Sequence, residues 1–580
     1  MNRDKKLRDE RVMEAYLDMK KGKVSRREFL RYASLMGASL AALGLASCAT
    51  PTPAAAPATP APVEVTKLVE KQVEVTKVVE KILTATPIPT AMGGVKRGGT
   101  LNSSFFFSTE KFNDPAIISN YFVSNTLRQV CEYLTRVMPD MTVKPALATS
   151  WTPSADGKTW TIALRQNVKF NHGKVFNADD VVFTFNRLLD PKTASGFTGI
   201  ANYLQPNSVE KVDDYTVKFH ADRAVADFAY HLASYMAAVL PADWGGDFYT
   251  QPWGTGPFTI KEYHPDERII FQRREDYWDL GLDGKPLPYL DSLEIRNYPD
   301  DASRLDALLK GDIQLSGINT SMLPQIIKAD TVKPTYFQSG GFFNGVLHTD
   351  EKPFDDVRVR QALKIAVDRA KWVDSVYMGY AIPGNDTPLA PTVYADAPDI
   401  PATQQDIEGA KKLLAEAGYP NGLNLTAIFI NDDLTTSTAT WLAASAKAAG
   451  FNITLKPDPE YWQHWLNKWG PNTIGVSNWG MRSTPSEYFN ISYASKSVWN
   501  ETHWNNKDFN DKLAQYDAEF DNSKRKSMLT DLCTLIKEDG GLLTAGHYQV
   551  LYSQSRQLKN FGMVPMGFTY YADCWLDPEA

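Results

Sequence analysis

Strand-like and helix-like segments alternate from about residue 97 to the end of the chain, without a fixed short repeat. Residues 159–164 alternate small polar and apolar side chains, which predicts a strand with one buried face. Apolar residues at helical spacing predict core-facing helices over 359–367 and 410–417. This region of about 480 residues is too long for one ordinary domain. The sequence therefore predicts a mixed α/β fold with two or more lobes.

Local capping signals mark where several of these helices begin and end. Asn177, followed by Asp180 three residues later, is typical of a helix start because both side chains can accept hydrogen bonds from free backbone N–H groups. Asp355 or Asp356 has the same role before 359–367. Gly418 suits the left-handed position that ends a helix.

The charge pattern argues against a nucleic-acid partner. The chain has 61 Lys and Arg against 68 Asp and Glu, a net charge of −7, and the two signs are interspersed without a basic block. Aromatic residues make up 12% of the chain and include 14 Trp. Rings beyond those that fill the cores can line a cleft, where flat faces bind sugars, peptide side chains and heterocycles.

The first 48 residues have the layout of an export signal. Adjacent Arg26 and Arg27 precede a short apolar run over 32–47, which is too short and too weakly hydrophobic for a secure membrane span. The arginines, with Phe29 and Leu30, resemble a twin-arginine signal, and two chance arginines before an ordinary signal are the alternative. The run ends in Leu-Ala-Ser-Cys48, which resembles a bacterial lipobox. We therefore expect a lipid on Cys48 that anchors the protein to the membrane.

Residues 49–96 are expected to form a tether. Residues 49–62 are almost entirely Ala, Pro and Thr and cannot form a core. A tandem repeat follows at 63–72 and 73–82, and two copies are too few for a solenoid. We expect a flexible spacer here; a short helix or a weakly self-associating stalk is the alternative.

The four cysteines do not form a metal-binding pattern. Cys48, Cys131, Cys533 and Cys574 lack metal-ligand spacing, and their number is too low for a disulfide-stapled scaffold. A bridge between Cys533 and Cys574 is left open.

Five sequence blocks occur in one order along the chain: ALATSW at 146–151, DGKTWT at 156–161, GTGPF at 254–258, PFDDVRVRQAL at 353–363 and AKKLLAEAGYP at 410–420. In this order they resemble family 5 of the bacterial extracellular solute-binding proteins. That family serves oligopeptide, dipeptide, nickel and related ABC importers. The resemblance implies a binding protein without enzymatic activity, cofactor or bound metal of its own. Its partners would be a small organic ligand and ABC permease subunits, and it would act as a monomer on the outer face of the membrane.

The resemblance also implies a periplasmic-binding-protein type II fold, with two hinged α/β lobes and a subdomain inserted in the first lobe. Mapped onto this chain, lobe I would consist of 97–138, 251–335 and 546–580. The inserted subdomain would be 139–250, and lobe II would be 336–545.

The expected ligand site departs from the peptide-binding pattern. Peptide-binding relatives often have an Asp three residues after a cleft tryptophan, where it pairs with the peptide amine; here Trp479 is followed by Arg482. A guanidinium repels an amine and can bind a carboxylate or phosphate in a bidentate manner. This favours an anionic ligand, such as an opine-like, sugar-acid or modified-peptide molecule. The alternative is a slipped local alignment, with Arg482 in a surface ion pair; an uncharged oligosaccharide or a peptide held by its backbone also stays open.

Aromatic residues are expected to complete the wall of the cleft. Six tryptophans fall between residues 462 and 504, and Trp462, Trp479 and Trp499 are the candidates for ligand contact. The start of lobe II, with Phe342, Phe343 and Asn344, could add rings and backbone groups.

Three other functions are weaker interpretations. An extracellular hydrolase lacks support because the chain has no G-x-S-x-G elbow, H-E-x-x-H motif or Walker loop. Metal uptake is disfavoured by only eight scattered His, although a chelated metal could bind through its organic carrier. A sensor subunit that presents ligand to a receptor cannot be separated from an uptake protein by sequence.

Overall fold

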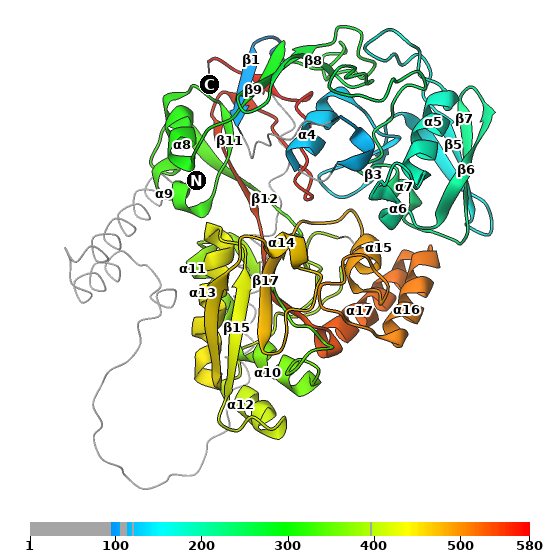
Figure 1. The fold of residues 1–580 in the computed structure, drawn as a ribbon. Coiled ribbons are helices and arrows are strands. Elements are labelled where there is room, and N and C mark those ends of the chain that lie inside the picture. Colours follow the sequence, from blue (N-terminus) through cyan, green and yellow to red (C-terminus); the bar gives the residue numbers. More distant parts are fainter. Residues whose placement is uncertain (1–93, 105–112, 119–120, 395–396, 580) are drawn as a thin grey trace, which may run out of the picture. The chain divides into compact units, whose positions relative to one another are not determined.

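The computed structural model describes residues 94–104, 113–118, 121–394 and 397–579 (Figure 1). The chain divides into two units, Met1–Val79 and Glu80–Ala580, and every described residue lies in the second unit. The predicted signal sequence with Cys48, the tandem repeat and nearly all of the tether lie outside the described residues. Within the described part, helices and strands alternate, and the predicted mixed α/β class is confirmed.

A seven-stranded sheet, the first sheet, is built from distant parts of the chain. Its strand order is β12-β19-β11-β1-β10-β9-β8, with β1 parallel to both of its neighbours and the other pairs antiparallel. The strands are β1 (Thr100–Ser104), β8 (Phe258–His264), β9 (Arg268–Arg273), β10 (Ser292–Arg296), β11 (Leu315–Gly317), β12 (Val332–Phe337) and β19 (Val550–Ser555). The associated helices are η2 (Pro115–Ile117), α4 (Tyr121–Val130), α8 (Asp301–Lys310), η3 (Thr320–Met322) and α9 (Leu323–Ile326).

A four-stranded antiparallel sheet lies within residues 148–221, in the order β4-β5-β7-β6. Its elements are β4 (Ala148–Pro153), β5 (Thr159–Leu164), α5 (Ala178–Leu189), α6 (Phe197–Ile200), β6 (Leu204–Asp213), β7 (Thr216–Ala221) and α7 (Phe228–His231). Buried and half-buried residues alternate along β5, as predicted. The predicted cap of α5 is also confirmed: the Asn177 side chain accepts a hydrogen bond from the Asp179 N–H, and Asp180 accepts one from the Asn177 N–H. Two short pairs, β2 (Thr135–Val137) with β3 (Val143–Pro145) and β20 (Leu558–Lys559) with β21 (Trp575–Leu576), complete this half of the chain.

A six-stranded mixed sheet, the second sheet, has the order β14-β18-β13-β17-β15-β16, with β15 parallel to β16 and β17. Its strands are β13 (Phe342–Val346), β14 (Ala381–Pro383), β15 (Leu423–Phe429), β16 (Phe451–Pro457), β17 (Thr473–Trp479) and β18 (Leu542–Tyr548). Helices α11 and α13 lie on one side of β15 and β17, and α16 and α17 on the other (Figure 1). The helices are α10 (Val357–Ala366), α11 (Arg369–Val376), α12 (Ile407–Glu416), α13 (Asp433–Ala446), η4 (Lys447–Ala449), α14 (Tyr461–His464), α15 (Pro485–Tyr488), η5 (Phe489–Tyr493), α16 (Lys507–Ala518) and α17 (Asn522–Asp539).

The predicted helix ends in this region are confirmed. Asp356 caps α10 by accepting a hydrogen bond from the Arg358 N–H, and Gly418 follows α12 with a φ of +94°. Such a left-handed φ favours glycine, since a side chain there would be strained.

Two neighbouring strands pass from the first sheet to the second. β12 leads to β13 through residues 338–341, and β18 leads to β19 through the single residue Gln549. The four strands pair antiparallel on both sides of the passage, with Phe337 opposite Val550 in the first sheet and Phe342 opposite His547 in the second. We call this two-stranded crossing the ribbon.

One half of the described chain is built around the first and four-stranded sheets, and the other around the second sheet. A cluster of buried apolar side chains contains residues from both halves. This cluster, which we call the seam, contains Val137, Met141 and Ala233 together with Tyr394 and Trp479. It is separate from the core around the first and four-stranded sheets and from the core of the second sheet.

The three described cysteines are buried and none of them forms a disulfide, which answers the question of a Cys533–Cys574 bridge that the sequence left open. Cys533 lies in the seam cluster, whereas Cys574 lies in the core around the first sheet. The two thiols therefore belong to different packing clusters and do not form a disulfide.

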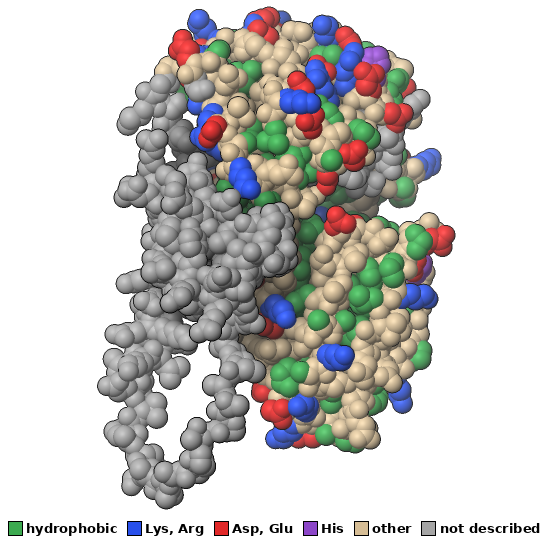
Figure 2. All heavy atoms as spheres, turned by 90° about the vertical axis from the view of Figure 1, so that its left-hand side faces the viewer, with side chains coloured by type: hydrophobic (Ala, Val, Ile, Leu, Met, Phe, Trp, Pro, Cys, Tyr) green, Lys and Arg blue, Asp and Glu red, His purple; other side chains and the backbone are tan. Residues whose placement is uncertain are grey.

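Charges of both signs are mixed on the described part of the face shown in Figure 2, without a block of one sign. Among the described residues, no helix has the length and apolar character that a membrane span requires. The same residues contain no group of three or more His, Cys, Asp or Glu side chains arranged to hold a metal ion.

Candidate functional site

A row of four tryptophans begins in α14 at Trp462, reaches the last residue of β17 at Trp479 and ends at Trp499. Successive ring centroids are 5.6 Å apart from Trp462 to Trp465, 6.0 Å from Trp465 to Trp479, and 6.2 Å from Trp479 to Trp499. Trp462 is 43% exposed and Trp479 only 6%, so the row leads from solvent into the seam. The structure thus brings together the three tryptophans predicted from the sequence and adds Trp465, which was not singled out.

Arg482 lies in the loop after β17 and covers the inner end of this row. Its guanidinium carbon is 5.6 Å from the ring centres of both Trp479 and Trp499, which are cation–π distances. No carboxylate in the described part of the chain lies within ion-pair distance of Arg482, and its buried Nε has no hydrogen-bond partner there. The Tyr394 hydroxyl donates to the Arg482 carbonyl at 2.7 Å. The arginine is thereby held by its backbone. A buried carboxyl lies beside it: Glu487 accepts a hydrogen bond from the Ser483 N–H at 3.1 Å, and the positive charge of Arg482 opposes the rise in the Glu487 pKa that burial causes, although the two groups do not form an ion pair.

Glu501 is a buried carboxylate behind the tryptophan row. It accepts hydrogen bonds from Trp479 Nε1 at 2.8 Å, Asn344 Nδ2 at 2.9 Å and Ser477 Oγ at 3.3 Å. Burial raises its pKa to about 7, and the three hydrogen bonds oppose this rise. Sequence reasoning missed Glu501 because its partners come from two other strands; its position two residues after Trp499 was the only local signal.

We expect Glu501 to make stability depend on pH. Its folded pKa is raised above the usual 4.5, so the native state holds a proton that the unfolded state releases, and stability falls as pH rises from about 4.5 through about 7. The loss over this window is up to about 3 kcal/mol. In Glu501→Gln the amide oxygen can still accept the hydrogen bonds from Trp479 and Asn344, and the part of the pH dependence of stability that comes from Glu501 should disappear. Urea unfolding of both proteins at about pH 5 and about pH 8 measures how much the free energy of unfolding changes between the two pH values. An equal change in the wild type and in Glu501→Gln would rule out titration of Glu501 as its source.

Phe342, Phe343 and Asn344 lie on the central strand β13, between β17 and β18. The Phe342 and Asn344 side chains are fully buried, and Phe343 is 4% exposed. The Phe343 ring packs against Trp372, and Asn344 bonds to Glu501. Their side chains support the sheet beneath the tryptophan row, and the structure does not bring them to its exposed face.

Side chains from the half of the chain that contains the first sheet lie close to the loop that carries Arg482. Ser483 Oγ donates a hydrogen bond to the sulfur of Met566 at 3.2 Å. Two residues further on, the Phe568 ring lies 5.9 Å from that of Tyr235. Burial raises the pKa of Tyr235, the positive charge of Arg482 opposes this rise, and Glu487 adds to it. The site is therefore built from both halves.

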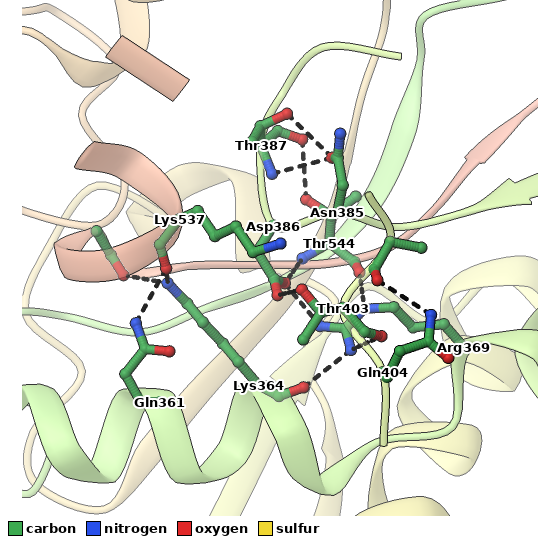
Figure 3. A network of polar contacts seen from close by, with 12 residues as sticks. Gln361, Lys364, Arg369, Asn385, Asp386, Thr387, Thr403, Gln404, Lys537 and Thr544 are labelled. Atoms are coloured by element: carbon green, nitrogen blue, oxygen red, sulfur yellow. Dashed lines mark hydrogen bonds and ion pairs between the residues drawn. The ribbon is translucent and has the colours of Figure 1, made fainter. Parts of the chain in front are cut away.

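A buried ion pair fixes the segment that carries Tyr394. Asp386 and Arg369 form a 2.7 Å pair in which each side chain is 1% exposed (Figure 3). Asp386 also accepts hydrogen bonds from the Thr403 hydroxyl at 2.6 Å and the Thr544 N–H at 3.0 Å. Arg369 donates to the carbonyl oxygens of Thr544 and Lys364, both at 2.8 Å. This network ties Asp386, eight residues before Tyr394, and Thr403 to β18 and α10.

Comparisons with known proteins identify similar chains. A family model described as "Bacterial extracellular solute-binding proteins, family 5 Middle" matches residues 142–501. Heme-binding protein A of Haemophilus influenzae is 28% identical over 515 residues, which cover 80% of this chain and 91% of that protein. The dipeptide-binding protein of Escherichia coli is 28% identical over 462 residues, which cover 73% and 84%. Among solved structures, the ABC transporter substrate-binding protein CtaP of Listeria monocytogenes has a TM-score of 0.72 and 25% identity, covering 83% of this chain and 100% of that chain. The segment matched by the family model contains Arg482 and the whole tryptophan row.

Proposed function

The chain belongs to the bacterial extracellular solute-binding proteins of family 5, and from this we propose that it captures a small organic ligand between two closing lobes and delivers it to an ABC permease. Its fold is the two-lobed type II fold of periplasmic binding proteins. The family and its structural relatives are binding proteins of transporters, and the chain is not an enzyme. Lobe I would comprise 97–138, 251–335 and 546–580, with 139–250 inserted and 336–545 as lobe II.

The observation that carries the ligand proposal is the pairing of Arg482 with the tryptophan row. A half-buried guanidinium that forms no ion pair in the described chain, and whose Nε has no hydrogen-bond partner there, favours a ligand with a carboxylate or phosphate. The indole faces favour a flat or apolar body beside that group. An opine-like, sugar-acid or modified-peptide molecule combines both features. Trp462, Trp479 and Trp499 would contact it, while Phe342, Phe343 and Asn344 would position the wall from behind.

The N-terminal part of the proposal rests on the sequence alone. A lipid on Cys48 would anchor the protein to the outer face of the membrane, and residues 49–96 would tether the folded part as a monomer. The twin-arginine pattern at Arg26 and Arg27 would direct export.

Ligand binding would act by shifting an equilibrium between open and closed lobes. A ligand that contacts both lobes binds the closed form more tightly, and a shift from 1:99 to 99:1 requires about 5.5 kcal/mol of differential binding. The permease would then recognise the closed form.

Native mass spectrometry of the protein purified without refolding tests this proposal. We expect a co-purified organic molecule that leaves on mild denaturation, and X-ray scattering should show a smaller radius of gyration when that molecule is added back. Tight binding without any compaction would contradict the closing mechanism. Chemical conversion of the bound molecule would contradict a pure binding role.

A further inference from the structure

Arg128, on α4 in the half of the chain that contains the first sheet, has a buried guanidinium that forms no ion pair among the described residues. Its side chain is 4% exposed. It donates to the Tyr570 hydroxyl at 2.7 Å and to the Ala233 carbonyl at 3.4 Å, whereas its Nε has no partner among the described residues. Its guanidinium carbon stacks 4.0 Å from the Phe568 ring centre and 4.5 Å from that of Tyr133.

The nearby carboxylates do not neutralise this charge. Glu132 accepts hydrogen bonds from Tyr277 at 2.9 Å and Trp278 at 2.7 Å, and its nearest cation is Arg136 at 3.5 Å. A small cavity of about 20 Å³ lies against Arg128 and is also lined by Arg136, Glu132 and Asp573. It has room for about one water molecule or one ligand oxygen. Since an unpaired buried charge is costly, a cation kept in this state is a candidate for binding an anion.

A series of side-chain contacts leads from Arg128 to the neighbourhood of Arg482. Phe568, which stacks on Arg128, contacts the Tyr235 ring at 5.9 Å. Met566, two residues earlier, accepts the hydrogen bond from Ser483, next to Arg482. The contacts that lead from one guanidinium group toward the other are thus made by aromatic and thioether side chains, and Glu487, which accepts a hydrogen bond from the Ser483 N–H at 3.1 Å, is the acidic group beside Arg482.

We propose that the ligand carries two anionic groups joined by an apolar body, one group bound by Arg128 and the other by Arg482. This rests on the proposed binding function and narrows the ligand class from anionic to dianionic. Each lobe supplies one cation, so only the closed form neutralises both charges of one ligand. The apolar body lies against Phe568, Tyr235 and Trp479.

The test uses linear α,ω-dicarboxylates from succinate to sebacate, each with its monomethyl ester, measured by isothermal titration calorimetry. At the best chain length, the wild-type protein should bind the diacid about 30-fold more tightly than the monoester. In Arg128→Gln and in Arg482→Gln, the two should bind within about threefold of each other, because one cation is missing. A matched series of α,ω-bisphosphonates distinguishes phosphate-type from carboxylate-type groups.

Arg165→Gln is the matched control. Arg165 also stacks on an indole, 3.9 Å from the Trp278 ring centre, but lies outside the seam, and this variant should keep the full preference for the diacid. If Arg128→Gln does not fold, Arg128→Lys keeps the charge and should retain a smaller preference.

Two results overturn the inference. One is that no diacid or bisphosphonate binds better than its singly charged partner. The other is that Arg128→Gln keeps the preference that Arg482→Gln loses, which would indicate a ligand with one anionic group. Either result leaves the proposed binding function standing, because that function is contradicted only by the mass spectrometry and scattering outcomes given above.

Discussion

Replacing Asp386 by Asn is expected to lower the free energy of unfolding by roughly 3 to 5 kcal/mol, the cost typical of removing one partner from a buried ion pair. Arg369 would keep its charge at 1% exposure with no carboxylate beside it. Asn is the most informative substitution because it removes the negative charge but keeps the shape of Asp. It also tolerates the left-handed backbone at this position, where φ is 59°. Urea unfolding followed by tryptophan fluorescence measures the change.

Glu408→Gln is the matched control, since Glu408 pairs with Lys411 on the surface at 83% and 50% exposure. Exposed pairs contribute little, so this variant should stay within about 0.5 kcal/mol of the wild type. A loss below about 1 kcal/mol in Asp386→Asn would show that the network in Figure 3 does not stabilise the fold as described.

Changing Arg482 to Asp is expected to weaken binding of the co-purified anionic molecule by more than about 100-fold, because an attractive charge-assisted contact becomes a repulsive one. The same change restores the acidic residue of peptide-binding relatives, so peptides with a free amine should gain affinity. Calorimetry with the co-purified molecule and with a dipeptide measures both effects.

Arg482→Lys provides a graded comparison. It keeps the charge but loses the planar fork, and should cost about tenfold in affinity for the anion. If Arg482→Asp binds that anion within about threefold of the wild type, Arg482 does not contact it. Unfolding curves for each variant separate lost contacts from lost structure.

Local features of the fold were predictable because their causes are local. Asn177 and Asp180 cap α5 through groups two and three residues away, and Gly418 ends α12 through its own backbone. The alternation along β5 likewise reflects only which face of one strand is buried.

The parts of the site that depend on distant contacts were predicted less well. Trp462, Trp479, Trp499 and Arg482 were identified because they fall within one stretch of sequence, and the structure does bring them together. Glu501, by contrast, is defined by hydrogen bonds from β13 and β17. Arg128 is defined by Tyr570, more than four hundred residues away, and no pattern in its own helix marks it.

The ribbon limits how the two halves can move. Both strands leave the first sheet at the pair Phe337 and Val550 and enter the second at Phe342 and His547, so the passage between the two pairs is four residues long on one strand and two residues, Tyr548 and Gln549, on the other. Because the strands are hydrogen-bonded to each other on both sides, they must bend together, about an axis across the pair. In the proposed closing movement, the bend at the ribbon would carry Arg128 and Arg482 toward each other together with the halves that hold them.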